Sequence, residues 1–234
     1  MRSAFVTGFG CLALAGSPLL AGVPHEETLV CPIGNETVEV VGTSSCTYGM
    51  ATTMSLRSVS SCDFVTRLPV CPSSGIPLYA EFPPAATERL KAFIETDGYR
   101  ESLEASRYLR AYLIDLELNL LSDQERFWML QDGHFYDAGT TFGDAAYFRA
   151  YQTALDKALE ATDDENAAFM RAMAAYASFK AGDEALARDL MAAAETLTGN
   201  YSETIKAYIA LLDACLGRPN AEECQPEYEI DLPF

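Results

Sequence analysis

The sequence has few basic residues and few histidines. Its 234 residues include 16 Lys and Arg against 34 Asp and Glu, a formal net charge of −18. A surface this acidic repels nucleic-acid phosphates and anionic lipid headgroups, so we expect neither nucleic acid nor a membrane surface as a partner. Only two histidines occur, and no serine or cysteine motif is recognisably paired with either. We therefore predict a protein that is not an enzyme and needs no cofactor.

An apolar stretch at residues 4–23 follows Met-Arg-Ser at the N-terminus. One positive charge, an apolar core and a Gly16-Ser17-Pro18 break are the pattern of a signal peptide. We assign residues 1–22 to it, with cleavage near Gly22, and predict export to the periplasm or the cell exterior. A retained membrane anchor is the alternative, but four glycines and one proline make this stretch a poor spanning helix.

The rest of the chain has a globular composition, with 49% hydrophobic and 21% charged residues. Residues 23–82 form a predicted β-rich, cysteine-containing head, because short alternating and β-branched segments are separated by Gly and Ser/Thr turns. We expect its strands near residues 38–40, 52–59, 64–66 and 78–79. A head this small needs a covalent or metal cross-link for stability.

Pro83-Pro84 marks a change to Ala-, Leu- and Glu-rich sequence. We predict a helical body over residues 83–217, followed by a C-terminal tail over 218–234, so the fold class is α+β and mostly α. Helices are expected near 86–96, 101–121, 123–136, 143–161, 164–181, 183–197 and 201–216. Ser122 with Glu125 forms a capping box, and Gly182-Asp183 ends one helix and begins the next.

Residues 166–197 are the most regular part of the body. Gly182-Asp183 separates two amphipathic helices, and the second places Ala187, Met191 and Ala194 on one face together with Leu197. This resembles one tetratricopeptide-type unit, in which small residues let neighbouring helices approach closely. A compact irregular helical bundle is the alternative.

Six cysteines remain after the signal peptide, which contains Cys11. An even number in an oxidising compartment favours disulfides. Cys215 and Cys224 flank a Gly- and Pro-containing turn, so we predict a local disulfide that holds the tail against the last helix. A redox-active pair is the alternative, but the spacing is not Cys-x-x-Cys.

Two short segments, 31–34 and 71–75, each resemble half of a zinc knuckle. A zinc ribbon presents four thiolates from two Cys-x-x-Cys turns, with a glycine that lets the chain return tightly. Here Gly34 and Ser74 occupy the positions of the second ligands. Neither residue is a good zinc ligand.

The order of half-knuckle, strands, second half-knuckle, aromatics and helices resembles an uncharacterised bacterial family with an N-terminal zinc-ribbon-like segment and tetratricopeptide-like helices. The matching residues are Cys31-Pro32, Val70-Cys71-Pro72, Gly75, Tyr79 and Phe82. The resemblance implies a fold and no activity.

If this ribbon geometry persists, it implies that Cys31 and Cys71 face each other and form a disulfide in place of the metal. Cys46–Cys62 would then be the second bridge. Two other pairings of these four cysteines are also open. A zinc site formed by Cys31, Cys46, Cys62 and Cys71 is a further alternative.

Other candidate residues carry weaker patterns. His25 could be the third residue after cleavage, but Pro24 lacks the amide that an N-terminal copper site needs. His134 could act as a general base with Asp132 and Asp137, although a structural histidine at a helix end is the more common case.

Met50 and Met54 offer sulfur ligands to Cu(I), but such methionines more often fill a core or an edge. A dense aromatic series is expected mainly in the core, with some members lining a groove for a peptide. Its members are Phe127, Trp128, Phe135, Tyr136, Phe142, Tyr147, Phe148 and Tyr151.

The function that we predict is an exported, non-catalytic scaffold that binds a protein or peptide partner in the cell envelope. The alternative is a thiol-redox or metal-binding (zinc or copper) protein that acts through the head cysteines.

Overall fold

The computed structural model describes residues 22–196 and 201–233. The predicted signal peptide lies outside these residues except for Gly22, which begins the first strand. Among the described helices, none has the length and apolar character needed to cross a membrane. The chain is a mostly helical α+β protein, as the sequence predicts.

The strands form two small antiparallel sheets. A two-stranded ribbon pairs β1 with β2, and a three-stranded sheet has the order β4-β3-β5. Their bounds are β1 Gly22–Val30, β2 Thr37–Cys46, β3 Ala51–Thr53, β4 Ser58–Val59 and β5 Glu229–Ile230. Because β5 comes from the C-terminal tail, the last residues of the chain complete a sheet that begins in the head.

The helices follow the head in sequence order. Their bounds are α1 Pro84–Phe93, α2 Asp97–Ser102, α3 Arg107–Leu118, α4 Asp123–Tyr136, α5 Ala138–Thr141, α6 Ala145–Leu159, α7 Asp164–Lys180, α8 Glu184–Ala194 and α9 Ser202–Cys215. A short 3-10 turn, Glu222–Cys224, follows α9.

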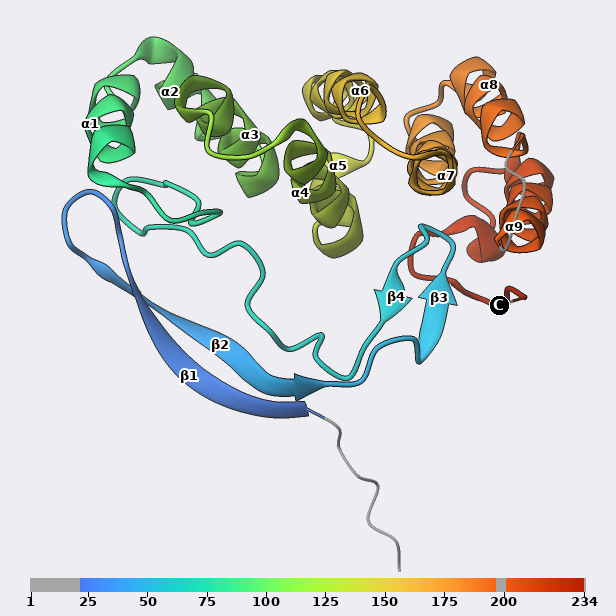
Figure 1. Ribbon diagram of the computed structural model, residues 1–234, viewed down its shortest axis with the longest axis horizontal. Helices are drawn as coiled ribbons and strands as arrows, with labels where there is room; N and C mark the ends of the chain where they lie inside the picture. Colours follow the sequence, from blue (N-terminus) through green and yellow to red (C-terminus); the bar gives the residue numbers. More distant parts are fainter. Residues whose placement is uncertain (1–21, 197–200, 234) are drawn as a thin grey trace, which may run out of the picture.

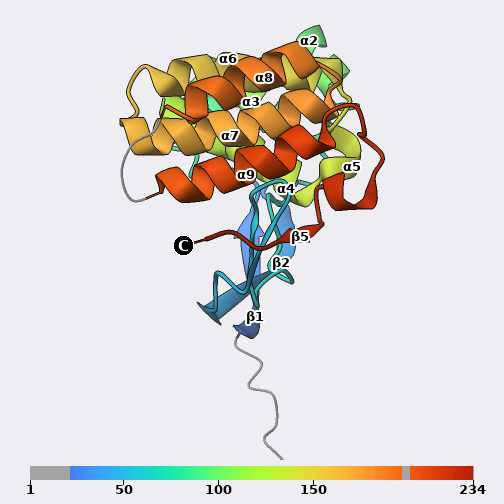
Figure 2. The same cartoon turned by 90° about the vertical axis from the view of Figure 1, so that its right-hand side faces the viewer.

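The helices form one curved layer, and the β1–β2 ribbon crosses beneath it (Figure 1). The turn that joins β1 to β2 lies below α1, and the other end of the ribbon points towards the β3–β4 hairpin, which lies below α7 (Figure 1). The view from the side shows the helices stacked across the top and the ribbon projecting away from them (Figure 2). The head packs against the helices at two places, near Cys31 and Cys71 and at Met54 of the hairpin segment.

The buried head residues belong to clusters that also contain helical residues. Cys31, Cys71 and Ile76 pack with Leu90 of α1 and Ile114 of α3. Met54, by contrast, packs in the cluster formed by α7, α8 and α9. Leu90 and Ile114 are fully buried, and burial of each such side chain stabilises the fold by about 1.5–3 kcal/mol.

The predicted helix over 101–121 is wrong in its bounds. Ser106 is an N-cap rather than an interior residue, because its hydroxyl accepts the Leu109 amide at 3.2 Å and begins α3. At the other end, Asn119 adopts a left-handed conformation with φ 54°. The carboxylate of Asp115 then accepts the amides of Leu120 and Leu121, so the chain leaves the helix there.

The strand predictions are partly wrong. The segment 52–59 is a hairpin, in which Leu56 has φ 63° and Thr53 accepts the Leu56 amide. Residues 64 and 65 lie in a turn and a bend, residues 78–79 lie in irregular chain, and neither segment belongs to a strand. Each has only isolated backbone bonds, such as Thr66 N–H to the Val41 carbonyl at 2.9 Å.

The local helix signals are confirmed. Both halves of the capping box at Ser122 and Glu125 are present at the start of α4. Gly182 has φ 83° between α7 and α8, a conformation that glycine adopts without steric cost. Asp183 accepts the Leu186 amide at 3.1 Å, so it caps α8.

Candidate functional site

The six described cysteines form three disulfides: Cys31–Cys71, Cys46–Cys62 and Cys215–Cys224. These are the pairs that the sequence analysis favours. Their Cα–Cα distances are 5.9, 5.6 and 5.7 Å, respectively. These distances are usual for a disulfide. Three disulfides are typical of proteins from oxidising compartments outside the cytosol.

The Cys31–Cys71 disulfide joins two turns with similar backbone geometry. The Cys31 amide donates to the Glu36 carbonyl at 2.9 Å, and the Cys71 amide donates to the Ile76 carbonyl at the same distance. Each turn contains a glycine at positive φ, which the tight return of the chain requires: Gly34 at 84° and Gly75 at 73°.

Glu36 connects the same two turns. Its carboxylate accepts the Ser73 amide at 3.0 Å and the Ser73 hydroxyl at 2.6 Å. Among the described residues, Cys31, Glu36 and Cys71 are the group of metal-ligand side chains whose donor atoms all lie within 4.8 Å of one another. Because the two sulfurs are bonded to each other, they are not the thiolates that zinc binds.

Cys46 and Cys62 are not part of that group. They form their own disulfide at the end of β2, so the four head cysteines are not brought together as one metal site. Cys62 is 1% exposed, and both Cys31 and Cys71 are buried. Buried sulfurs of this kind are poorly accessible to an exchanging thiolate.

His134 is buried among aromatic rings. Its imidazole stacks on Phe142 with a centroid distance of 4.3 Å, and its Nδ1 lies 3.1 Å from the Thr141 hydroxyl. Burial lowers the pKa of His134 to about 3. The ring is therefore neutral at ordinary pH, and with 2% exposure it has no access to a dissolved substrate. This placement corresponds to a structural histidine rather than a general base.

The remaining sequence candidates lie apart from one another. His25 on β1 contacts Glu27 at 2.5 Å on the exposed ribbon. Met54 is 1% exposed in the core of α7–α9, whereas Met50 is 62% exposed. The two methionines therefore do not form a shared sulfur site. Met50 instead lines a groove.

This groove, which we call the hairpin groove, is lined by residues of the β3–β4 hairpin, α7, α9 and the tail. Figure 1 shows where these elements lie. Its volume is about 570 Å³. Most of its lining side chains are apolar. The lining consists of residues 49–52, Leu56, Ser58, Phe169, Met173, Thr204 and 230–232.

Backbone and side-chain contacts fix the tail that forms one wall of the groove. The Met54 amide donates to the Tyr228 carbonyl at 2.7 Å, and Thr52 faces Ile230 across the sheet. Further along, the Thr204 hydroxyl donates to the Pro233 carbonyl. The groove therefore has walls from three parts of the chain that are far apart in sequence.

The aromatic series lies mainly in the core, as predicted. Phe127, Tyr147 and Tyr151 are at most 1% exposed. Trp128 differs, because it is 38% exposed and lines a second groove beside α4.

Sequence reasoning missed the tail and α7 as parts of a site. Tyr228, Ile230 and Leu232 alternate with Glu229 and Asp231, a period-2 pattern that indicates a strand. That signal was present in the sequence. No comparable signal placed α7 beside the hairpin, since their contact is set by tertiary packing.

Comparison of the chain with protein-family models, with curated proteins and with solved structures finds no match. The structure itself shows a small disulfide-bonded β head followed by a helical array.

Proposed function

We propose that this chain is an exported, non-catalytic scaffold that binds a segment of a partner protein or peptide in the hairpin groove. The single observation that supports this most is an apolar groove that exposes large side chains to solvent. Met50 in the wall is 62% exposed, and Phe169 packs edge-on to Tyr201, which is 39% exposed. Contiguous exposed apolar surface usually marks an interaction site.

The groove has the size and chemistry of a ligand-binding site. A volume of about 570 Å³ falls within the roughly 300–1,000 Å³ that is usual for such pockets. Met50 and Met173 are flexible and polarisable, so they can adapt to more than one apolar side chain. The groove therefore suits the apolar anchor residues of a peptide.

Charge indicates the residues that should flank those anchors. Asp231 lines the groove, and Glu229 lies on the adjoining strand. Among the described residues, neither carboxylate takes part in an ion pair. The whole chain carries a formal charge of −18. The occupant that we propose is therefore a segment with apolar anchors flanked by Lys or Arg.

Export and disulfides fit this role. The proposed location is the periplasm or the cell exterior, where the three disulfides persist. Two of them fix the groove indirectly: Cys46–Cys62 closes the loop that contains the β3–β4 hairpin, and Cys215–Cys224 ties the tail to α9. The tetratricopeptide-like character of the α7–α8 pair remains part of this proposal, because such helices commonly bind peptides.

Selection from a random peptide library displayed on phage tests the proposal. We expect the oxidised protein to enrich peptides with aromatic or branched aliphatic residues flanked by Lys or Arg. The enriched peptide should bind Met50→Gln about tenfold more weakly, a loss of about 1.4 kcal/mol.

Leu116→Gln is the matched control, because Leu116 is 53% exposed and lies on α3, away from the groove. It should leave affinity unchanged within twofold. Enrichment of acidic peptides, no enrichment at all, or equal weakening by both substitutions would overturn the proposal.

A thiol-redox or metal-binding function is the second candidate, and the clustering of Cys31, Glu36 and Cys71 favours it. After reduction by a dithiol, two thiolates and one carboxylate would supply three of the four ligands that zinc usually takes. Mass spectrometry without reductant decides between the two states. Six oxidised cysteines without zinc support the scaffold, whereas free thiols at Cys31 and Cys71 with bound zinc support the metal protein.

A further inference from the structure

A second groove lies beside α4, on a different part of the molecule from the hairpin groove. We call it the Trp128 groove. Its volume is about 440 Å³, and its walls come from α3, α4 and the segment that connects the head to the helices. The lining residues are Arg67, Leu68, Leu78, Tyr79, Tyr108, Leu121, Glu125, Trp128, Met129 and Asp132.

Three of these residues occupy one face of α4. Glu125, Trp128 and Asp132 are separated by three and four positions, so successive turns of the helix place their side chains next to one another. An indole ring thus lies between two carboxylates along the wall of the groove.

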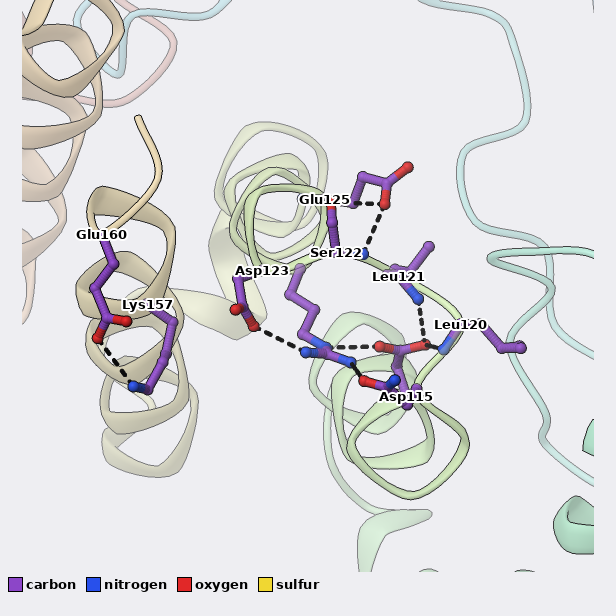
Figure 3. Close-up of polar contacts among 10 residues, drawn as sticks. Asp115, Leu120, Leu121, Ser122, Asp123, Glu125, Lys157 and Glu160 are labelled. Atoms are coloured by element: carbon purple, nitrogen blue, oxygen red, sulfur yellow. Dashed lines mark hydrogen bonds and ion pairs between the residues drawn. The ribbon is translucent and has the colours of Figure 1, made fainter. Parts of the chain in front are cut away.

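Glu125 is already engaged, as the view of the turn between α3 and α4 shows (Figure 3). Its carboxylate accepts the Ser122 amide and the Ser122 hydroxyl, both at 2.7 Å. Asp115 fixes the same turn by accepting the amides of Leu120 at 3.0 Å and Leu121 at 3.2 Å. The start of α4 is therefore rigid, and Glu125 serves mainly as part of its cap.

Asp132 has no such partner. It makes no hydrogen bond or ion pair among the described residues, and the surrounding protein raises its pKa to about 6, with Arg67 opposing this shift. Arg67 does not pair with it directly, because its guanidinium lies over the Tyr136 ring at 4.3 Å from the centroid. The Asp132 side chain is exposed, so its carboxylate is accessible to a cation from a partner and attracts it electrostatically.

Trp128 adds a second attraction for a cation. It is 38% exposed, and tryptophan has the aromatic face that binds ammonium and guanidinium groups most strongly. An exposed indole beside an unpaired carboxylate complements a positively charged side chain in both shape and charge.

We infer that the Trp128 groove binds a cationic side chain, Lys or Arg, of a partner protein, with the cation against the Trp128 ring and paired with Asp132. The site is separate from the hairpin groove and rests on different residues. If the hairpin groove binds no peptide, the inference about the Trp128 groove still stands. If the Trp128 groove binds no cation, the proposed peptide binding in the hairpin groove still stands.

The experiment uses the indole N–H of Trp128, which gives one NMR signal because the chain has a single tryptophan. The oxidised protein is titrated with N-acetylarginine methylamide and, separately, with N-acetylcitrulline methylamide, its neutral counterpart. We expect a saturable shift with the arginine probe and a millimolar Kd. Binding of the citrulline probe should be at least tenfold weaker, since it keeps the shape but loses the charge.

Two variants complete the test. Asp132→Asn should weaken binding of the arginine probe about tenfold, while Asp189→Asn, the same change at an exposed position on α8, should leave it within twofold. Circular dichroism checks that both variants are folded. The inference is overturned if the citrulline probe binds as well as the arginine probe. Equal binding to Asp132→Asn, or no saturable shift up to about 50 mM probe, also overturns it.

Discussion

Replacement of His134 by phenylalanine should remove a defined part of the acid sensitivity of the fold. The imidazole is buried against Phe142 and two tyrosine rings, Tyr147 and Tyr151. Its Nε2 has no hydrogen-bond partner among the described atoms. Phenylalanine keeps an aromatic ring for the stack on Phe142 and cannot take up a proton. The comparison therefore isolates the cost of protonating this one buried side chain.

The direction of the pH effect on stability follows from the pKa values of His134 in the unfolded and in the folded chain. The pKa of His134 falls from 6.5, the ordinary value, to about 3 in the folded protein. Between these pH values the unfolded chain binds a proton that the folded chain excludes, so stability is full above about pH 6.5 and is lost as the pH falls. A pH of about 5 lies about 1.5 units below the ordinary pKa. The loss of folding stability there is about 2 kcal/mol, at 1.36 kcal/mol per pKa unit.

Urea denaturation followed by circular dichroism, with the disulfides kept oxidised, measures this effect. From about pH 7.5 to about pH 5, the wild-type free energy of unfolding should fall by about 2 kcal/mol more than that of His134→Phe. The raised pKa of Asp132 acts in the opposite direction, but Asp132 is present in both proteins and its contribution cancels. Equal pH dependence of the two proteins would refute the buried, neutral histidine.

Two further predictions concern the packing of the fold. Replacement of both Cys31 and Cys71 by alanine should lower the free energy of unfolding by about 4 kcal/mol, because the disulfide closes a loop with a sequence separation of 40; a loss below about 1 kcal/mol in urea denaturation would contradict this. Gly133→Ala should cost about 1–3 kcal/mol, since a Cβ there would overlap the Tyr147 hydroxyl between α4 and α6. Gly139→Ala, where a Cβ meets no atom within 4 Å, is the control and should change thermal stability little.

The helical part of the fold could be predicted where the signals are local. Ser122, Glu125 and Gly182 fix helix ends through bonds or backbone conformations that involve only nearby residues. Ser106 shows the limit of this reasoning. A serine is compatible with both a helix interior and a cap, so the sequence alone does not place the break before α3.

The pairing of β3 with β5 was harder to predict because the two strands are far apart in the sequence. β3 is three residues long and pairs with β5 across most of the chain, Thr53 facing Glu229. The alternation at residues 228–232 indicates a strand, but it does not say which distant segment that strand pairs with. The hairpin groove has the same origin, since Met50, Phe169 and Ile230 come together only in the folded protein.

The sequence predicted the disulfide pairs better than it predicted the roles of the other candidate residues. The even number of cysteines and the two half-knuckle segments favoured the pairs that the structure contains. The role of His134 could not be fixed from sequence, because whether its ring is buried depends on Phe142 and on the packing of α6 against α4.

NMR of the methionine methyl groups, with the library-selected peptide added, tests the central claim most directly. Met50 and Met173 line the hairpin groove, Met129 lines the Trp128 groove, and Met191 lies on α8. The account predicts that the Met50 and Met173 signals shift saturably, with the Met191 signal unchanged. A shift confined to Met129 or Met191, or no shift at peptide saturation, would contradict binding in the hairpin groove.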